Sequence, residues 1–188
     1  MGYRQVFGDE GLGDINGTVT SLPAGMALGE VRWNETGTKK YRLFYNAGGA
    51  SIPTYNVFQR SFGGTSLYSV TVTTTTETGC TAAAGAMQGN KTVTTGAYFW
   101  GAVYGHPFSL ISATVTIATG NGVCMEGTSG GGKCMKATIP SNNAMAYNVG
   151  DATSANGGDI SVAGGVGTRF FLLFEDVPAW AKSLVGGV

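Results

Sequence analysis

Residues 127–134 form the stretch of this sequence that comes nearest to a known chemical motif. They read Gly-Thr-Ser-Gly-Gly-Gly-Lys-Cys, which matches a phosphate-binding loop except that Cys134 replaces the Ser or Thr that holds magnesium. The motif also needs a strand before it and a helix after it, whereas the stretch from Met135 to Pro140 is short and strand-like. We therefore expect a hairpin loop here and no nucleotide or other cofactor.

The other side chains suited to acid–base or metal chemistry are scattered along the chain. The single histidine, His106, directly precedes a proline and has no acidic neighbour in sequence, so the pattern does not favour a hydrolase triad. Asp9, Glu10 and Asp14 lie among glycines, but their spacing differs from that of a calcium loop and is more typical of a solvated loop. A paired-carboxylate glycosidase is the enzymatic alternative. We expect no catalytic residues and no metal site.

Two of the three cysteines flank the glycine-rich loop. If that loop closes a hairpin, Cys124 and Cys134 approach each other, and a disulfide between them would add roughly 2–3 kcal/mol in the chain-entropy model. The alternative is a pair of small buried thiols in a reducing cytosol. Cys80 is left over, and three cysteines without His or acidic companions do not indicate a zinc site.

The composition limits the classes of partner. Charged residues make up 12% of the 188-residue chain and the net charge is zero, whereas roughly 25% is usual in soluble domains. A nucleic-acid-binding protein would show a basic excess, so we expect no nucleic-acid partner. No run approaches the roughly 18 apolar residues of a membrane span, and the N-terminus lacks the apolar core of a signal peptide. A weakly charged surface suits a protein that packs against its own copies or a larger surface.

The strongest structural signal is the aromatic stretch from Gly96 to Gly105. Its alternation places Trp100 on one face of a strand and Phe99 on the other, and neither face is polar. We expect a central strand with one face in the core, packed with Phe170 to Phe174, and the other face covered by a neighbouring subunit.

Short strands separated by turns are predicted along most of the chain. A hairpin is expected from residues 28–33 and 39–46, with further strands at 56–60, 68–76, 110–119, 144–148 and 168–175. Residues 80–88 fit either one helical turn or a packed loop, and His106-Pro107 is expected to break the central strand. The fold class is all-β: a single barrel or sandwich over residues 28–176, with an extended N-terminal arm (1–27) and a short C-terminal tail (177–188).

The order of these features resembles a known family. Leu28 to Arg32 is followed by a strand ending in Asn46-Ala47-Gly48, a Thr-rich strand, the Ala97–Gly105 strand and an apolar terminal strand. This resembles the decoration, or cement, proteins of tailed bacteriophages, small β-rich virion proteins encoded near the major capsid protein. The arm, the insertion at 120–134 and the tail depart from the family's pattern and leave the oligomeric state and the contact surface open.

The resemblance implies a structural role without catalysis. Such proteins are made in the host cytoplasm and sit on the capsid surface of the virion as homodimers or homotrimers, where they bind the major capsid protein and clamp neighbouring capsomers. On that basis we expect Tyr3 and Phe7 in the arm and Trp180 in the tail to contact neighbouring chains, since many weak contacts add up by avidity.

Two other functions compete with this interpretation. A carbohydrate-binding β-sandwich, such as an adhesin, would use exposed aromatics on one face, for which Tyr41, Tyr45 and Tyr68 are the candidates. Another virion subunit, such as a tail-tube protein, would assemble as rings instead of binding a shell.

Overall fold

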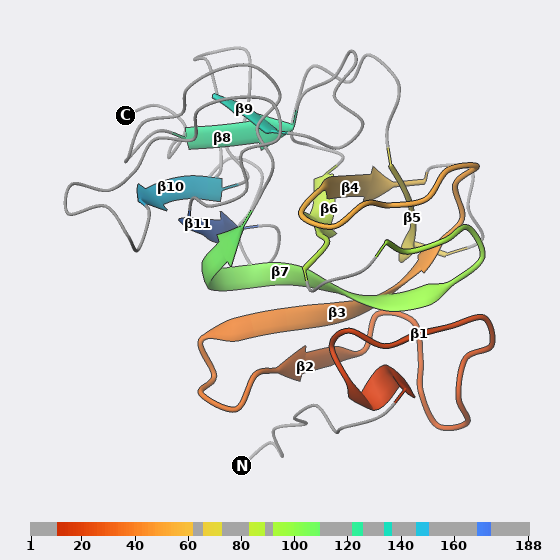
Figure 1. Cartoon of the computed structure of the whole chain (residues 1–188). Coiled ribbons are helices and arrows are strands. Elements are labelled where there is room, and N and C mark those ends of the chain that lie inside the picture. Colours follow the sequence, from red (N-terminus) through yellow and green to blue (C-terminus); the bar gives the residue numbers. More distant parts are fainter. Residues whose placement is uncertain are drawn as a thin grey trace.

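The computed structural model describes residues 11–61, 66–72, 83–88, 92–109, 122–125, 134–136, 146–150 and 169–173. This part of the chain is strand-rich and holds no α-helix, which confirms the all-β prediction. A 3-10 turn, η1 (Gly11–Gly13), precedes eleven strands (Figure 1). The strands are β1 (Thr18–Val19), β2 (Val31–Trp33), β3 (Lys39–Asn46), β4 (Val57–Arg60), β5 (Ser69–Thr71), β6 (Ala83–Ala86), β7 (Tyr98–Ser109), β8 (Gly122–Met125), β9 (Cys134–Lys136), β10 (Ala146–Gly150) and β11 (Arg169–Leu173).

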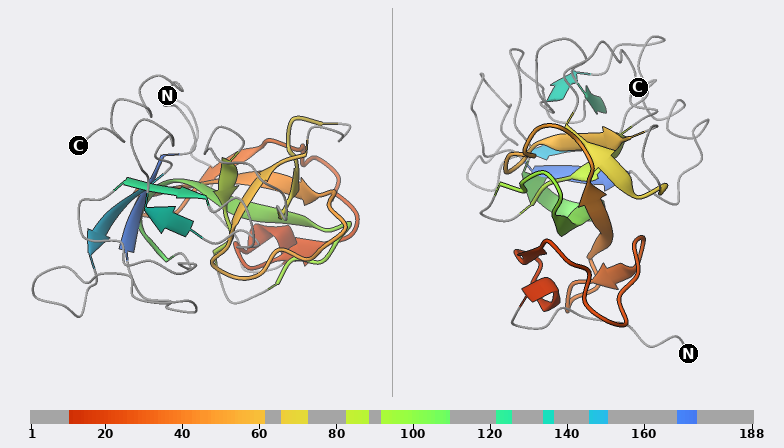
Figure 2. Two further views of the ribbon diagram at one scale, coloured as in Figure 1. Left: turned by 90° about the horizontal axis from the view of Figure 1, so that it is seen from above. Right: turned by 90° about the vertical axis from the view of Figure 1, so that its right-hand side faces the viewer.

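Five of these strands close a barrel in the order β3–β5–β4–β6–β7, with β7 returning to β3. The β3–β5 pair is parallel and the other four pairs are antiparallel. β2 adds to β3, β1 adds to β7, and β11, β10, β8 and β9 continue the sheet from the second half of β7. Two further views show the barrel and the strands beside it (Figure 2).

The predicted hairpin is confirmed as β2 and β3, in antiparallel register from Val31↔Arg42 to Trp33↔Lys40. Its turn is organised by Asn34, whose side-chain oxygen accepts hydrogen bonds from the backbone N–H groups of Thr38 and Lys39, at 2.9 and 2.8 Å. An Asn side chain that replaces backbone partners in this way is a common turn device. The hairpin therefore starts the barrel with a locally determined element.

The side chain of Asn46 explains why β3 ends at this residue. Its side chain is fully buried, and its Nδ2 donates to the backbone oxygens of Ala50 and Val93, at 3.0 and 3.2 Å. Its Oδ1 accepts from the Gly48 N–H at 3.1 Å. A buried amide with these partners satisfied holds the turn after β3 against the segment that leads into β7.

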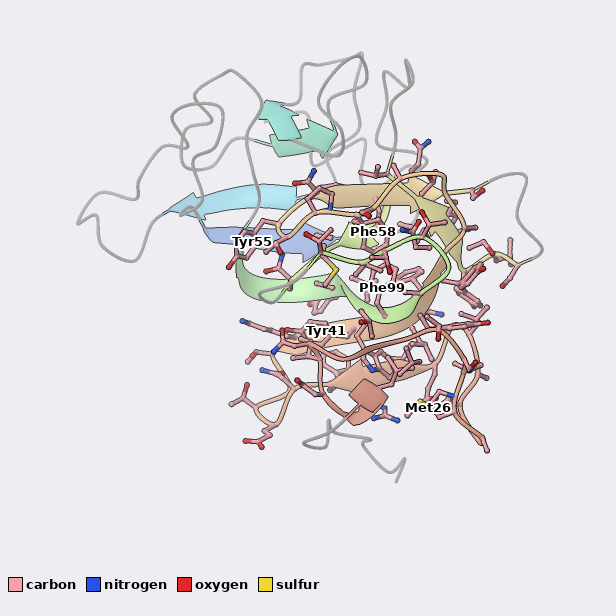
Figure 3. The ribbon with its side chains drawn as sticks, turned by 45° about the vertical axis from the view of Figure 1, so that its right-hand side comes forward. Met26, Tyr41, Tyr55, Phe58 and Phe99 are labelled. Carbon is pink, nitrogen blue, oxygen red and sulfur yellow. The ribbon has the colours of Figure 1, made fainter. Side chains whose placement is uncertain are left out.

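The barrel interior is built around three phenylalanines, of which Phe58 and Phe99 are labelled in Figure 3. The ring of Phe58 lies 5.0 Å from that of Phe44 and 5.2 Å from that of Phe99, both edge-on. Gly101 makes room for it, because a Cβ on Gly101 would overlap the Phe58 ring and lie 3.0 Å from Phe44 Cδ2. Gly85 does the same from β6, where a Cβ would lie 2.7 Å from Phe58 Cζ. Edge-to-face packing of buried rings is a large source of stability.

The packing around Phe58 also decides the undecided segment at 80–88. Residues 83–86 form β6, a barrel strand paired with β4 and β7. Gly85 has no room for a side chain there, because the Phe58 ring occupies the space that a Cβ would fill. Both alternatives, one helical turn and a packed loop, are therefore wrong for residues 83–86.

The prediction that His106-Pro107 breaks the central strand is also wrong. β7 runs from Tyr98 through Pro107 to Ser109, and its second half pairs with β11. The register shifts between Phe170 and Leu172, opposite this stretch, so the proline lies at an irregularity where a ladder hydrogen bond is not needed. The expected pairing of this strand with the apolar stretch near residue 170 is present, and within Gly96–Gly105 the ladder pairs Tyr104 and Gly105.

The described part of the expected arm is packed, not extended. Leu12 is buried, Thr18 and Val19 pair with Phe99 and Tyr98 of β7, and Ile15, Val19, Leu22 and Met26 pack against the core. This corrects both the boundary at residue 28 and the expectation that a neighbouring subunit covers the second face of β7. Residues 11–27 pack on the barrel through these apolar side chains and the short strand β1, so the described part of this segment belongs to the domain.

Candidate functional site

The outer face of the β3–β7 pair is the most elaborate polar arrangement in the described part of the chain. Phe44 and Phe99 point into the barrel, so their neighbours Leu43 and Trp100, which are register partners, lie on the outside. Both are fully buried all the same. The N-terminal segment covers them, with Leu12 at only 2% exposure.

A hydrogen bond joins this cover to the barrel. The Trp100 indole Nε1–H donates to the backbone oxygen of Leu12 at 2.6 Å. Both groups are buried, and a buried indole N–H normally needs such an acceptor. The bond spans 88 positions of sequence, so it ties the start of the described chain to the centre of the barrel.

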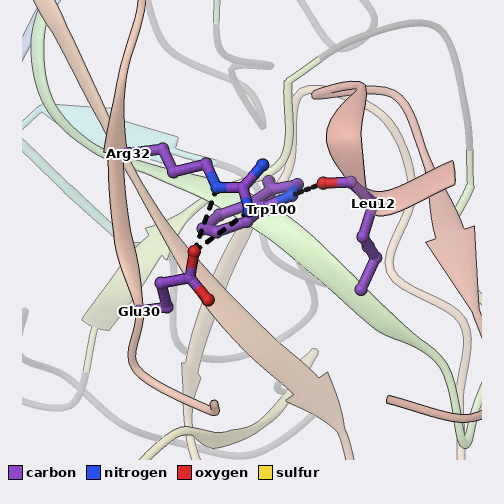
Figure 4. Close-up of polar contacts among 4 residues, drawn as sticks. All are labelled: Leu12, Glu30, Arg32 and Trp100. Carbon is purple, nitrogen blue, oxygen red and sulfur yellow. Dashed lines mark hydrogen bonds and ion pairs between the residues drawn. The ribbon is translucent and has the colours of Figure 1, made fainter. Parts of the chain in front are cut away.

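Arg32 extends from β2 over the same indole. Its Cζ lies 4.8 Å from the Trp100 ring centroid, within the range of a cation–π contact. Glu30 Oε1 accepts from Arg32 Nε at 3.1 Å and lies 3.0 Å from Nη2 (Figure 4). The side chains of the pair are 11% and 17% exposed, and the paired carboxylate offsets the cost of holding the guanidinium in this position.

Tyr41 continues the outer face beside Arg32, its register partner. Burial raises the pKa of the Tyr41 hydroxyl well above its ordinary value of 10.0, because the phenolate would lose its hydration. Together Leu12, Trp100, Arg32, Glu30 and Tyr41 form what we call the clasp. The clasp holds the N-terminal segment on the barrel. It consists of a neutral phenol, a paired cation and one strong hydrogen bond.

A second aromatic group lies at the tip of the β2–β3 hairpin. The rings of Trp33 and Tyr104 meet edge-on at 6.2 Å, and Lys40 Nζ lies 5.9 Å from the Trp33 centroid. Lys40 is the register partner of both aromatics. Gly105 follows with a φ of +106°, and a Cβ there would collide with the Thr38 carbonyl oxygen. This group locks the hairpin against the bend in β7.

The three tyrosines considered for carbohydrate stacking do not share one face. Tyr41 is buried, and Tyr45 is half-buried with its ring 4.9 Å from that of Tyr98. Tyr68 packs on the other side of β3, where its ring is 6.5 Å from that of Phe44 and 5.2 Å from Arg42 Cζ. Its hydroxyl oxygen also accepts from Arg42 Nη1 at 3.2 Å. These positions do not give the flat exposed platform that a sugar ring needs.

The residues predicted to make inter-subunit contacts, Tyr3, Phe7 and Trp180, lie outside the described residues. The hairpin between the two cysteines is present as β8 and β9, but Cys124 is paired with Met135 and Cys134 with Met125. The cysteines are therefore one register step apart and not directly opposite. The possible disulfide between them stays a prediction.

The chemical motifs weighed in the sequence are placed only in part. The strand β9 begins at Cys134, directly after the glycine-rich loop, where a phosphate-binding loop requires a helix. His106 lies within β7. Of the three acids near the N-terminus, Asp14 is described, and its Oδ1 accepts from the Asn16 N–H at 3.0 Å, a local turn contact. Over the ranges that the structure describes, no group of three or more His, Cys, Asp or Glu side chains is placed to hold a metal ion.

Sequence reasoning missed the clasp. Leu12 offers a backbone oxygen, and a carbonyl carries no residue-specific signal. Glu30 and Arg32 did give a signal, because residues two apart on a strand share a face and opposite charges there pair. Trp100 was placed on one face of the aromatic strand, but the need of its N–H for an acceptor was not used.

Three comparisons with known proteins were made. Protein-family models, curated protein sequences and solved structures were compared with the chain, and none gave a match. Among the described residues no helix combines the length and the apolar character needed to cross a membrane.

Proposed function

We propose that this chain is a structural virion protein of the decoration type, which binds the outer surface of a capsid and stabilises the shell by clamping neighbouring capsomers. Its partners are then the major capsid protein and further copies of itself, as a homodimer or homotrimer. The role asks for a rigid domain with contact surfaces and for no chemistry.

One observation carries the proposal. The two stretches that resemble decoration proteins most, Lys40–Gly48 and Ala97–Gly105, contain β3 and the first half of β7, which are neighbouring strands of the barrel. The resemblance therefore covers two strands that pair with each other, and not isolated similar residues. In this pair of strands Asn46 holds a turn by hydrogen bonds, and Gly105 lies where two backbone segments approach closely.

The use of charge is consistent with a binding role. The chain has only 11 basic and 11 acidic residues, and Arg32 and Lys40 are at most 9% exposed. Charged side chains that make contacts within the chain are not on the surface. The surface then has fewer charged groups that would lose their hydration when a partner binds. Charged residues are depleted at the centre of protein–protein interfaces for that reason.

The packing of the N-terminal segment limits which residues are left for the proposed contacts to neighbouring subunits. Residues 11–27 cover their own barrel, so they are not free to serve as an extended arm in a closed chain. The proposed contacts to neighbours are therefore assigned to Tyr3 and Phe7, ahead of that segment, and to Trp180 in the tail.

Purified particles test the proposal directly. The copy number of the chain, measured by quantitative mass spectrometry, is expected to be in fixed proportion to the major capsid protein, and cryo-electron microscopy should place it on the outer shell. A few copies arranged as rings in the tail would support the tail-tube alternative instead. Binding on a glycan array without binding to shells would support the carbohydrate-binding alternative.

Co-sedimentation with undecorated capsids tests the assigned contacts. The double variant Tyr3→Ala with Phe7→Ala is expected to bind more weakly than the natural chain. Leu67→Ser is the matched control. Leu67 is 70% exposed, so this substitution also removes an exposed apolar side chain, but from the barrel and not from the N-terminal residues. Equal loss in both variants would contradict the assignment to the N-terminal residues.

A further inference from the structure

Residues 11–19, which we call the strap, contain an Asn-Gly bond, Asn16–Gly17. Asparagine is a thermolabile residue, because the backbone nitrogen that follows it can attack its side-chain amide. Glycine in the following position permits this attack best, since it has no Cβ in the way and adopts conformations that other residues avoid. Of the asparagines that the structure describes, Asn16 alone precedes a glycine. The residue that follows it therefore makes Asn16 the described asparagine most prone to deamidation.

The side chain of Asn16 is exposed to water. Its backbone N–H donates to Asp14 Oδ1 at 3.0 Å, but among the described residues no hydrogen bond holds its side-chain amide. The amides of Asn34 and Asn46 are held by turn hydrogen bonds, and Asn56 is buried. Water thus reaches the Asn16 amide more freely, and this amide can turn toward the next nitrogen without breaking a hydrogen bond of its own.

The turn from Asp14 to Gly17 controls the attacking nitrogen. The Gly17 N–H donates to the Asp14 backbone oxygen at 2.9 Å, and a hydrogen-bonded N–H gives up its proton less readily. The strap is well attached around this turn: Leu12 is buried before it, β1 pairs with β7 after it, and Ile15 packs on the core from within it. Ile15 and Gly17 also make further contacts. The attack therefore needs a local opening of the turn, which the fold makes infrequent.

We propose that Asn16 is a site of spontaneous deamidation, whose rate is set by opening of the turn from Asp14 to Gly17. The Gly17 nitrogen bonds to Asn16 Cγ, and the side-chain nitrogen leaves as ammonia with the proton from the Gly17 N–H. The product is a cyclic imide. One water molecule then opens the ring: breaking the bond to Cγ gives aspartate, and breaking the bond to the backbone carbonyl carbon gives isoaspartate. The reaction consumes only water.

Both products disturb the strap. Each places a carboxylate beside Asp14, whose own carboxylate accepts from the N–H of residue 16, and like charges this close repel. Isoaspartate also adds a carbon to the backbone two residues before Thr18, which pairs with Phe99. Deamidation therefore changes the strap in one direction with time, from closed to more readily opened. The inference does not rest on capsid binding, since it concerns the purified protein alone.

Peptide mapping by mass spectrometry tests the proposal in the full chain, incubated at mildly alkaline pH and sampled over time. Asn16 is expected to gain the mass of amide-to-acid conversion several-fold faster than Asn34, Asn46 and Asn56, with isoaspartate among the products. Gly17→Ala is the control, because Gly17 is not one of the described glycines with a positive φ, and its added methyl group should slow the reaction several-fold. Conversion of Asn16 no faster than that of Asn34, or an unchanged rate in Gly17→Ala, would overturn the proposal.

Two comparisons test the role of the turn. The Asn16 rate should be several-fold lower in the folded chain than in the same chain unfolded in guanidinium chloride, because unfolding releases the Gly17 N–H. Equal rates would overturn control by the turn. After equal incubation, strap peptides should exchange hydrogen several-fold faster than before incubation in the natural chain but not in Gly17→Ala. Deamidated protein whose strap exchanges as slowly as that of fresh protein would overturn the effect on the strap.

Discussion

The two faces of the β3–β7 pair are both buried, but they are closed in different ways. On the inner face Phe44, Phe58 and Phe99 pack edge to face around space that Gly85 and Gly101 leave free. On the outer face the N-terminal segment around Leu12 covers Trp100. A hydrogen bond from the indole to Leu12 holds this segment, and an ion-paired arginine packs on the same indole.

The difference shows what kind of contact determines each region. The inner face depends on shape, because rings fill a closed volume and each missing atom leaves a cavity. The outer face combines apolar packing with a few directional bonds, and we expect it to open without disturbing the barrel. The inner face should therefore set the global stability and the outer face a local opening, and the predictions below test that division.

The largest effect is expected from Phe58→Ala. The ring is fully buried and contacts two other phenylalanines, so its loss should lower the free energy of unfolding by about 4 kcal/mol. Chemical denaturation measures this. A loss below about 1 kcal/mol would mean that the inner face does not set the global stability.

Gly101→Ala should have the next largest effect. The added methyl group overlaps the Phe58 ring, and overpacking of this kind costs about 2 kcal/mol. Gly49→Ala is the matched control, since a Cβ there meets nothing within 4 Å, and its effect should be close to zero. Phe58→Leu should partly rescue Gly101→Ala in a double-mutant cycle, and additive effects would contradict the proposed overlap.

On the outer face, Trp100→Phe should cost about 1–2 kcal/mol. It keeps an aromatic ring beneath Arg32 but leaves the Leu12 oxygen without its donor. Trp33→Phe is the control, because Trp33 is half-buried and its ring contact with Tyr104 survives in a phenylalanine. Equal effects in thermal unfolding would show that the indole hydrogen bond adds nothing.

The smallest effect is a pH dependence from Tyr41. Its pKa is raised in the folded state, so the unfolded chain loses this proton first and stability falls as pH rises above the ordinary value of 10.0. Below that value the contribution is fully present. Between about pH 10 and about pH 11 the free energy of unfolding should drop by about 1 kcal/mol. In Tyr41→Phe this part of the drop should be missing, and an unchanged profile would contradict the burial of the phenol.

Local patterns predicted much of the barrel. The β2–β3 hairpin, β4 and the start of β5 followed from apolar alternation and turn residues, and the pairing of β7 with β11 from their shared apolar character. These elements depend on residues close in sequence or on bulk hydrophobicity, which single residues report well.

The remaining features depend on contacts between distant residues. The sequence of β6 is ambiguous because Gly85 is needed to make room for the Phe58 ring and gives no signal of strand propensity. The strand through Pro107 depends on an irregularity in its ladder with β11, where three steps of β7 face two steps of β11. Residues 11–19 were predicted to be an arm because their main polar contact is a backbone oxygen, which any residue at position 12 would supply.

Hydrogen exchange followed by mass spectrometry tests the division between the two faces most directly. Peptides covering the strap, residues 11–19, are compared with peptides covering residues 41–46 of β3, in the natural chain and in Trp100→Phe. The strap is expected to exchange faster than β3 and to lose most of its remaining protection in Trp100→Phe, while β3 changes little. Strap and β3 peptides that exchange at the same rate in both proteins would show that the two faces open as one unit, and would contradict the account.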